Sequence, residues 1–247
     1  MEHISIVAET VFHIGPFPVT NTILTAWIVM CILVIVSFCI YKGMSYIPKK
    51  LQNGAEALIE ALLDFMETVG GSRDAAKRFF PIVATIFLYV LFSNWLGVFP
   101  GVGSIGIHEI REGKEVFIPF FRSAYSDLNM TLALALMTVI LSHLFGLWHV
   151  GAKHHLGKFI ILKSPIAFFT GILEIIGEFS KIISLSFRLF GNIFAGEVLL
   201  IIIGSLIPYV IPVPFLGLEL FVGLIQAIIF AVLAMVAFSS FTRTEAH

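Results

Sequence analysis

Residues 165–204 read PIAFFTGILEIIGEFSKIISLSFRLFGNIFAGEVLLIIIG, with no proline after the first position. Apolar residues fill most of this stretch and no glycine pair marks a break, so the pattern predicts one continuous helix. Forty helical residues extend about 60 Å, which is about twice the roughly 30 Å hydrocarbon thickness of a bilayer. Such an apolar helix stays within a membrane only if it is strongly tilted. The stretch therefore predicts a long, tilted membrane helix.

The whole chain has the composition of an integral membrane protein. Of its 247 residues, 58% are hydrophobic and only 13% are charged, and the mean hydropathy is +1.00. A soluble domain has about 25% charged residues, which it needs to cover its surface. The formal net charge of −1 gives no reason to expect a nucleic-acid partner.

The sequence has no pattern typical of a metal or cofactor site. Both cysteines lie in one apolar run without the spacing of a zinc site. His143 and His149 are six residues apart and fall on different faces of a helix, which favours hydrogen-bonded interface roles over metal binding. We interpret His154 and His155 as part of a solvated loop. No metal and no cofactor are expected.

Charge-poor runs predict the membrane crossings, and the last two form a hairpin because a proline-rich turn separates them. Residues 51–78 differ: apolar side chains recur there at helical spacing and acidic ones occupy the other face, as in an amphipathic helix on the cytoplasmic membrane surface. Packing of this helix on a partner subunit is the alternative. The fold class is an all-α integral membrane protein with a single domain, 1–247, and about five crossings: 22–41, 81–99, 129–150 and the tilted hairpin of 165–204 and 219–241.

Lys and Arg are unevenly divided between the two sides of this five-span arrangement. Residues 42–80 hold six, residues 151–163 hold three, and the tail adds Arg243, all on one side. The other side has three, all within 100–127, which we interpret as a solvated outer loop. Because cytoplasmic loops carry the excess of positive charge, the N-terminus is predicted outside and the C-terminus in the cytoplasm.

Ionisable side chains lie where the hairpin should be inside the membrane. Each costs about 2.5–3.5 kcal/mol to insert at the centre of a bilayer, so they should face protein or water and mark an ion path. The alternative is a set of internal salt bridges that lock the helix packing, above all for Glu178. These residues are Glu174, Glu178, Lys181, Arg188, Glu197 and Glu219.

Arg188 separates two acidic zones. Glu174 lies about 21 Å from it along the helix in one direction; Glu197 lies about 13 Å away in the other and on the opposite face. The hairpin register places Glu197 beside Glu219 and Arg188 beside Gln226, because both pairs are centred on the same turn. Paired carboxylates can share and pass protons, whereas an arginine keeps its proton and acts as a barrier.

The stretch SLSFRLFGNIFAGE at 184–197 resembles subunit a of F-type ATP synthase, and so does QAIIF at 226–230. NWLGVFP at 94–100 and SDLNMTL at 126–132 are similar to the same family, so that the likeness covers about residues 80–240. The resemblance implies a stator beside a rotating ring of c subunits. Protons or Na⁺ would enter through one half-channel and leave through a second.

The same resemblance implies a role for each matching residue. Arg188 matches the arginine that strips the proton from the ring carboxylate and blocks leakage between the half-channels. Glu197 and Glu219 match the outer relay, although many bacterial relatives have histidine where this chain has Glu219. The other matches are polar neighbours of the arginine (Asn192, Gln226), positions of the outer pathway (Asn94, Asp127, Asn129) and positions towards the cytoplasmic exit (Glu174, Lys181).

The sequence contains no GxxxxGK[ST] loop, nucleophile elbow or HExxH motif, so we expect no catalytic site in this chain. The resemblance implies the c ring, the b-subunit peripheral stalk and the F1 sector as partners, surrounded by membrane lipid, in a bacterial inner membrane. A self-contained ion-coupled transporter is the alternative, but such folds usually have inverted repeats, and the first half of the chain has no counterpart of the acidic hairpin. A structural scaffold would not explain the charges around Arg188.

Overall fold

The computed structural model describes residues 8–46, 50–99, 101–111, 114–157, 159, 164–207 and 210–242. This part of the chain is mainly helical. Its helices are α1 (Asn21–Lys42), α2 (Lys50–Gly70), α3 (Arg73–Val98), α4 (Leu128–Val150), α5 (Ala152–Gly157), α6 (Pro165–Leu206) and α7 (Pro212–Thr242). Its other elements are the strands β1 (Thr10–Ile14), β2 (Phe17–Thr20), β3 (Gly106–Arg111) and β4 (Lys114–Pro119) and the short 3₁₀ turns η1 (Val102–Ser104) and η2 (Ala124–Ser126).

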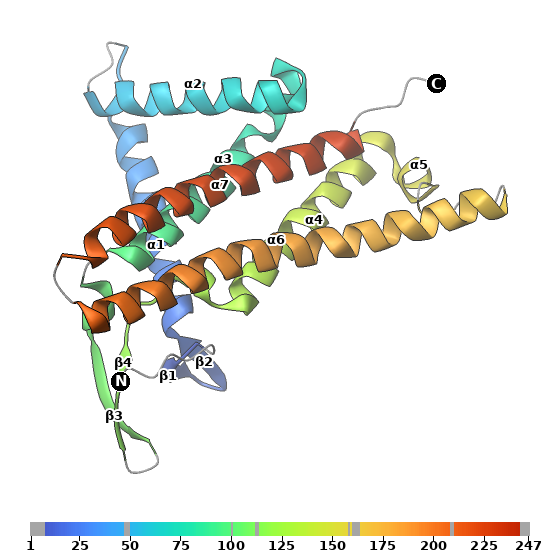
Figure 1. Cartoon of the computed structure of the whole chain (residues 1–247). Coiled ribbons are helices and arrows are strands. Elements are labelled where there is room, and N and C mark those ends of the chain that lie inside the picture. The colour runs from blue at the N-terminus through green and yellow to red at the C-terminus, as the bar shows by residue number, and fades with distance from the viewer. Residues whose placement is uncertain are drawn as a thin grey trace.

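Within the described residues, α1, α3, α4, α6 and α7 are long and apolar enough to cross a membrane, which confirms the all-α membrane fold. These helices contain the five predicted crossings, except that α3 ends at Val98, one residue before the predicted end. Figure 1 shows α2 and the C-terminal end of α7 at one end of the molecule and both β-hairpins at the other. If the helices cross a membrane, these two ends lie on opposite sides of it.

The boundary between α2 and α3 differs from the predicted one. Gly71 follows α2 with a φ of +80°, a left-handed conformation that favours glycine and ends the helix. Ser72 then caps α3, because its hydroxyl accepts a hydrogen bond from the backbone N–H of Ala75 at 3.2 Å. Residues 73–78, expected in the surface helix, therefore form the first turns of α3.

The helix α6 is unbroken from Pro165 to Leu206, as predicted. Ser164 caps its start by accepting a hydrogen bond from the N–H of Ala167 at 3.1 Å, and a proline at the first position needs no N–H. For the same reason α7 begins at Pro212, ahead of the predicted position. Figure 1 shows α6 and α7 side by side and steeply inclined to α1, as expected of a tilted hairpin.

Two antiparallel β-hairpins, which the sequence analysis did not predict, lie at the end opposite α2. In one, β1 pairs with β2; in the other, β3 pairs with β4, with Ile107 opposite Ile118. A Cβ at Gly106 would lie 2.2 Å from the Ile118 carbonyl oxygen, so glycine allows this close pairing. The 100–127 segment is therefore partly a hairpin and not simply a solvated loop. The prediction weighed its charges and ignored its strand-like residues.

The core lies where α3, α4 and α7 cross, and it supports α6 from one side. The rings of Phe79, Phe145 and Phe238 meet there in tilted and edge-to-face pairs, with centroids 5.3 Å to 5.7 Å apart. Leu189 and Ile193 of α6 are almost fully buried against this core. One face of the tilted helix is thereby fixed in place.

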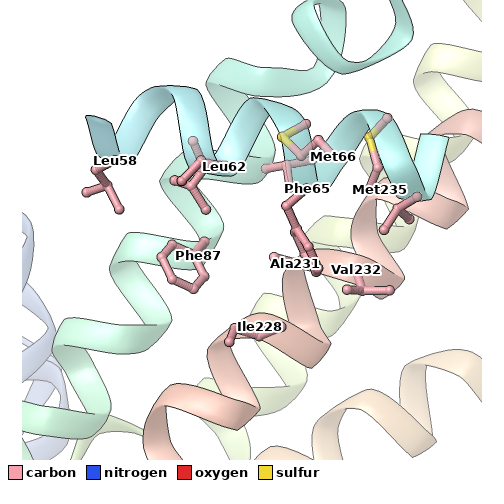
Figure 2. Close-up of a pocket in the computed structure, with 13 residues that line it drawn as sticks. Leu58, Leu62, Phe65, Met66, Phe87, Ile228, Ala231, Val232 and Met235 are labelled. Atoms are coloured by element: carbon pink, nitrogen blue, oxygen red, sulfur yellow. The ribbon is translucent and has the colours of Figure 1, made fainter. Parts of the chain in front are cut away.

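The amphipathic helix α2 turns its apolar side towards α3 and α7 and covers a cavity of about 160 Å³. Figure 2 shows Leu62, Phe65 and Met66 of α2 above this cavity, with Phe87 of α3 and Met235 of α7 among its other lining residues. Every lining residue is apolar, so the cavity offers no site for an ion or a proton. The chain itself therefore covers part of the apolar side of α2.

Candidate functional site

Arg188 lies on the face of α6 that the described chain leaves uncovered. Ser184 and Asn192 on the same face are exposed as well, whereas Leu189 and Ile193 behind them are buried. The guanidinium Nη2 donates to the Ser184 hydroxyl oxygen at 3.2 Å. No carboxylate of the described residues lies within ion-pair distance of it. The helix therefore presents on its open face a permanent cation that has no acidic partner among the described residues.

Glu219 of α7 packs against Gly196 of α6, and this contact fixes the register of the hairpin. A Cβ at position 196 would lie 1.8 Å to 2.2 Å from the carboxylate atoms of Glu219, so glycine alone leaves room. Glu219 thus lies next to the residue that precedes Glu197, as the predicted register requires. The side chains of Arg188 and Gln226, in contrast, do not form the predicted pair. Gln226 is buried on α7, Arg188 is exposed, and no hydrogen bond joins them in the described part of the chain.

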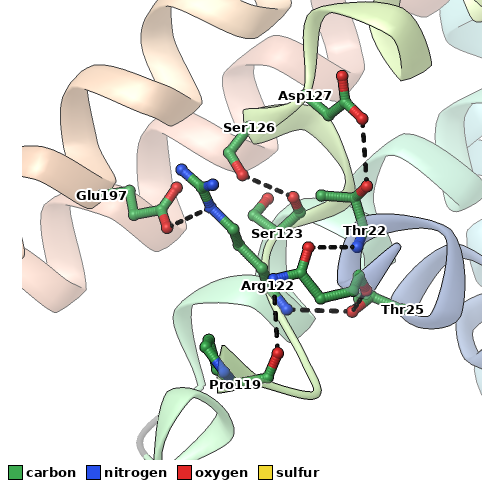
Figure 3. Close-up of polar contacts among 9 residues, drawn as sticks. Thr22, Thr25, Pro119, Arg122, Ser123, Ser126, Asp127 and Glu197 are labelled. Atoms are coloured by element: carbon green, nitrogen blue, oxygen red, sulfur yellow. Dashed lines mark hydrogen bonds and ion pairs between the residues drawn. The ribbon is translucent and has the colours of Figure 1, made fainter. Parts of the chain in front are cut away.

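Glu197 has a cationic partner that the sequence analysis missed. Figure 3 shows Arg122, from the segment before α4, reaching Glu197 on α6; its Nε donates to Glu197 Oε1 at 2.7 Å. The Arg122 side chain is 10% exposed and that of Glu197 26% exposed, so the pair is largely shielded from solvent. The sequence alone indicates only that Arg122 is a charge of the outer loop. Its position as the only charge between Pro119 and Asp127 was the available signal.

A hydrogen-bonded network next to Arg122 joins α1 to α4 (Figure 3). Asp127 caps α4: its Oδ1 accepts from the N–H of Asn129 at 2.9 Å, and its Oδ2 accepts from the Thr22 hydroxyl at 3.2 Å. The hydroxyl oxygen of Thr25 accepts from the backbone N–H of Arg122 at 3.2 Å. Asp127 is buried and the Asn129 side chain is exposed. Asp127 therefore ties the start of α4 to α1, and Thr22 and Thr25 are additions to the site.

Three buried amide and carboxylate oxygens near this end of the hairpin accept no hydrogen bond from the described residues. Asn94 of α3 donates through Nδ2 to the Gly223 carbonyl at 3.0 Å, but its Oδ1 has no such donor. The same is true of Glu197 Oε2 and Glu219 Oε1. Buried oxygens without a partner are costly, and a proton or a polar ligand would satisfy them. Their concentration on α3, α6 and α7 suits a path for protons or hydrated ions.

The other acidic residues lie on the N-terminal half of α6. Glu174 is exposed, whereas Glu178 is buried and accepts at Oε1 a hydrogen bond from Lys181 Nζ at 2.6 Å. Its Oε2 lies 3.7 Å from Nε2 of His143, whose Nδ1 is 3.1 Å from Nε2 of His155. The salt bridge considered for Glu178 is present, and the hydrogen-bonded role of His143 is confirmed. The loop interpretation of His155 is wrong, because its side chain is buried in α5.

Comparison with known proteins extends the likeness beyond the motifs. The family model described as ATP synthase A chain matches residues 23–239. ATP synthase subunit a of Moorella thermoacetica is 31% identical over 235 residues, covering 94% of this chain and 95% of the relative. ATP synthase subunit a of Geotalea daltonii is 34% identical over 220 residues, with coverages of 87% and 85%. That of Campylobacter jejuni is 32% identical over 237 residues, with coverages of 95% and 90%. The similarity thus includes nearly the whole chain.

Proposed function

We infer the function from one premise: this chain belongs to the ATP synthase A chain family. We propose that it is the stator subunit of the membrane sector Fo of F-type ATP synthase. It would provide two proton half-channels beside a rotating ring of c subunits and couple proton flow to ATP synthesis. The observation that carries the proposal is the position of Arg188, a permanent cation on the uncovered face of α6 with acidic residues on either side along the helix.

The outer half-channel in this proposal runs between α3, α6 and α7. Glu197 and Glu219 are its proton carriers, because each has a buried carboxylate oxygen that no described residue donates to, and their helices pack together at Gly196. Two close carboxylates can exchange a shared proton. Arg122 holds Oε1 of Glu197 and leaves Oε2 for the transfer. Asn94 would line the path from α3.

Arg188 is the barrier between the half-channels in this proposal. A guanidinium keeps its proton at every physiological pH, so it cannot relay protons, but it attracts an ionised carboxylate of the ring. Asn192 flanks it on the open face and Gln226 lies on the neighbouring helix. A proton that enters would leave only after the ring has carried it to the second half-channel, beside Glu174 and Lys181. A membrane potential drives this proton flow with about 2.3 kcal/mol per proton for each 100 mV.

We place the protein in a bacterial inner membrane because of its membrane-spanning helices and its similarity to bacterial relatives. The division of Lys and Arg in the sequence favours an N-terminus outside and a C-terminus in the cytoplasm. Because α2 and the C-terminal end of α7 lie at the same end of the molecule (Figure 1), both would lie on the cytoplasmic side of the membrane. ATP chemistry would belong to the F1 sector, and the b-subunit peripheral stalk would hold the stator. A self-contained transporter is disfavoured by the similarity to ATP synthase subunits over nearly the whole chain.

The proposal is tested by Arg188→Ala in the assembled holoenzyme, with ATP-driven proton pumping measured in inverted membrane vesicles. Because Arg188 is exposed and bonds only to Ser184 within the described chain, the complex should assemble while pumping disappears. The matched control is Arg73→Ala, which removes an arginine that pairs with Asp64 and Glu67 at the α2–α3 corner. Normal pumping by Arg188→Ala would refute the proposed function.

A further inference from the structure

We propose that His155, His143 and Glu178 form a proton relay, which joins α6 to the segment between α4 and α6. The relay lies on the side of Arg188 away from Glu197. This inference rests on the proposed function, since it names a route by which protons reach or leave the second half-channel. It assigns a role to a cluster of ionisable side chains that the outer path does not use.

Three separate elements bring the relay together. His143 comes from α4, His155 from α5 and Glu178 from α6. His143 Nδ1 is at hydrogen-bond distance, 3.1 Å, from His155 Nε2, and His143 Nε2 lies 3.7 Å from Glu178 Oε2. Both nitrogens of His143 thus have titratable partners. An imidazole that can accept a proton at one nitrogen and release one from the other suits a relay.

The two ends of the relay are buried, and His143 between them is 28% exposed. His155 is 3% exposed and Glu178 is 7% exposed. The ring of Phe159 contacts both imidazoles, with centroids 5.7 Å from each. Apolar side chains would fill this space at lower cost, because buried ionisable groups are weak stabilisers. Glu178 Oε2 also accepts no hydrogen bond from the described residues, so it can take a proton.

The charged group that faces the relay from α6 is Lys181. Its Nζ donates to Glu178 Oε1 at 2.6 Å, which leaves Oε2 directed towards His143 and balances the carboxylate after its proton has left. Among the described residues, the titratable groups that face the relay from α4 and α5 are the two imidazoles themselves. On α5, the neighbouring His154 is exposed and stands outside the cluster.

One passage through the relay moves one proton. The carboxyl group of Glu178 gives its proton to Nε2 of His143 and becomes a carboxylate. The Nδ1 proton of His143 passes to Nε2 of His155. The Nδ1 proton of His155 then passes to a water molecule that must reach this ring, which is 3% exposed. Both rings end neutral, each with its proton on Nε2 instead of Nδ1. Each ring then returns to its first tautomer before the next passage. The 3.7 Å separation between His143 and Glu178 is spanned by a small side-chain rotation or by one water.

The relay approaches α6 from its covered side. Glu178 precedes Arg188 by about 15 Å along the axis and lies about 80° around the helix from it. Lys181, in contrast, is within about 20° of Arg188 and shares its exposed face. The relay therefore reaches the open face through the Glu178–Lys181 pair, without involving Arg188 or the outer carboxylates. A separate half-channel requires such a route.

The relay is tested by His143→Gln and His155→Gln in the holoenzyme, with His154→Gln as the matched control. Passive proton uptake is measured in vesicles stripped of F1, at equal amounts of assembled Fo. Glutamine keeps hydrogen-bonding capacity but cannot shuttle a proton, so conduction should fall at least about tenfold in the first two variants. The control should conduct like the wild type. Added imidazole should restore part of the lost conduction, which a merely structural role would not predict.

Conduction within about twofold of wild type in both variants would overturn the relay. If His143→Gln does not assemble, His155→Ala decides, because it alters only the short α5: a loss restored by imidazole supports the relay, and a loss that imidazole leaves unchanged contradicts it. Arg188→Ala, measured in parallel, separates the two proposals. Lost pumping there with normal conduction in the histidine variants would reject the relay and keep the proposed function.

Discussion

Glu197, one of the two outer acidic residues, forms an ion pair with Arg122. The pair joins α6 to the segment before α4 through a 2.7 Å hydrogen bond, and both side chains are largely shielded. A hydrogen bond to a charged group contributes about 1.5–3 kcal/mol, more than a neutral one. Arg122 is therefore expected to fix the position of the Glu197 carboxylate and to keep Oε2 pointing into the path.

Replacing Arg122 with Gln should slow proton entry. Glu197 would lose its donor and its counter-charge, and a loss of about 1.5–3 kcal/mol corresponds to a decrease of about tenfold or more in pumping. ATP-driven pumping at equal amounts of assembled complex measures the effect. Arg122→Lys keeps the charge and should retain an intermediate rate. Wild-type pumping by Arg122→Gln would show that the ion pair is not part of the path.

At the scale of the helices, the hairpin depends on the contact of Gly196 with Glu219. The space between Gly196 and Glu219 is too small for a methyl group, since a Cβ at position 196 would lie 1.8 Å to 2.2 Å from the Glu219 carboxylate. The carboxylate is the end of a flexible side chain, so a larger residue would displace Glu219 before it separated α6 from α7. The register of the hairpin and the position of the proton carrier are therefore linked.

Gly196→Ala should impair pumping strongly while the complex still assembles. Shortening the displaced side chain in the double variant Gly196→Ala, Glu219→Asp should recover part of the activity, because it returns space to the added methyl group. Gly204→Ala is the control, since nothing lies within 4 Å of a Cβ there. Rates of proton pumping in inverted vesicles compare the variants. An unaffected Gly196→Ala enzyme would mean that Glu219 can work from another position.

The sequence predicted the helices better than the contacts between them. The length of α6 follows from composition and spacing along one chain segment and is confirmed by the unbroken helix. The Gly196–Glu219 contact agrees with the predicted position of Glu219 beside Glu197, whereas Arg188 and Gln226 form no hydrogen bond within the described residues. The pairing of Arg122 with Glu197 joins residues 75 positions apart in different elements, so periodicity carries no signal for it. The burial of His155 was missed for the same reason, because it depends on how α5 folds back on α4.

At the scale of the whole molecule, the core divides the tilted helix into two functional sides. The crossing of α3, α4 and α7 buries Leu189 and Ile193, and leaves Arg188 on the open face of α6. Glu197 and its partner lie towards one end of the molecule, and the Glu178 cluster lies towards the N-terminal end of α6. In the proposed function, the open face would meet the c ring, which is why a ring carboxylate could pass both zones in turn.

The most direct test of this account asks whether Arg188 alone keeps the two half-channels apart. Vesicles stripped of F1 are given a potassium diffusion potential after a carbodiimide has blocked the ring carboxylates, and proton uptake is followed. With the ring blocked, wild-type vesicles should stay tight, whereas Arg188→Ala vesicles should leak, because protons could then pass between the half-channels without rotation. Arg188→Ala vesicles as tight as the wild type, at equal Fo content, would contradict the barrier role on which the account depends.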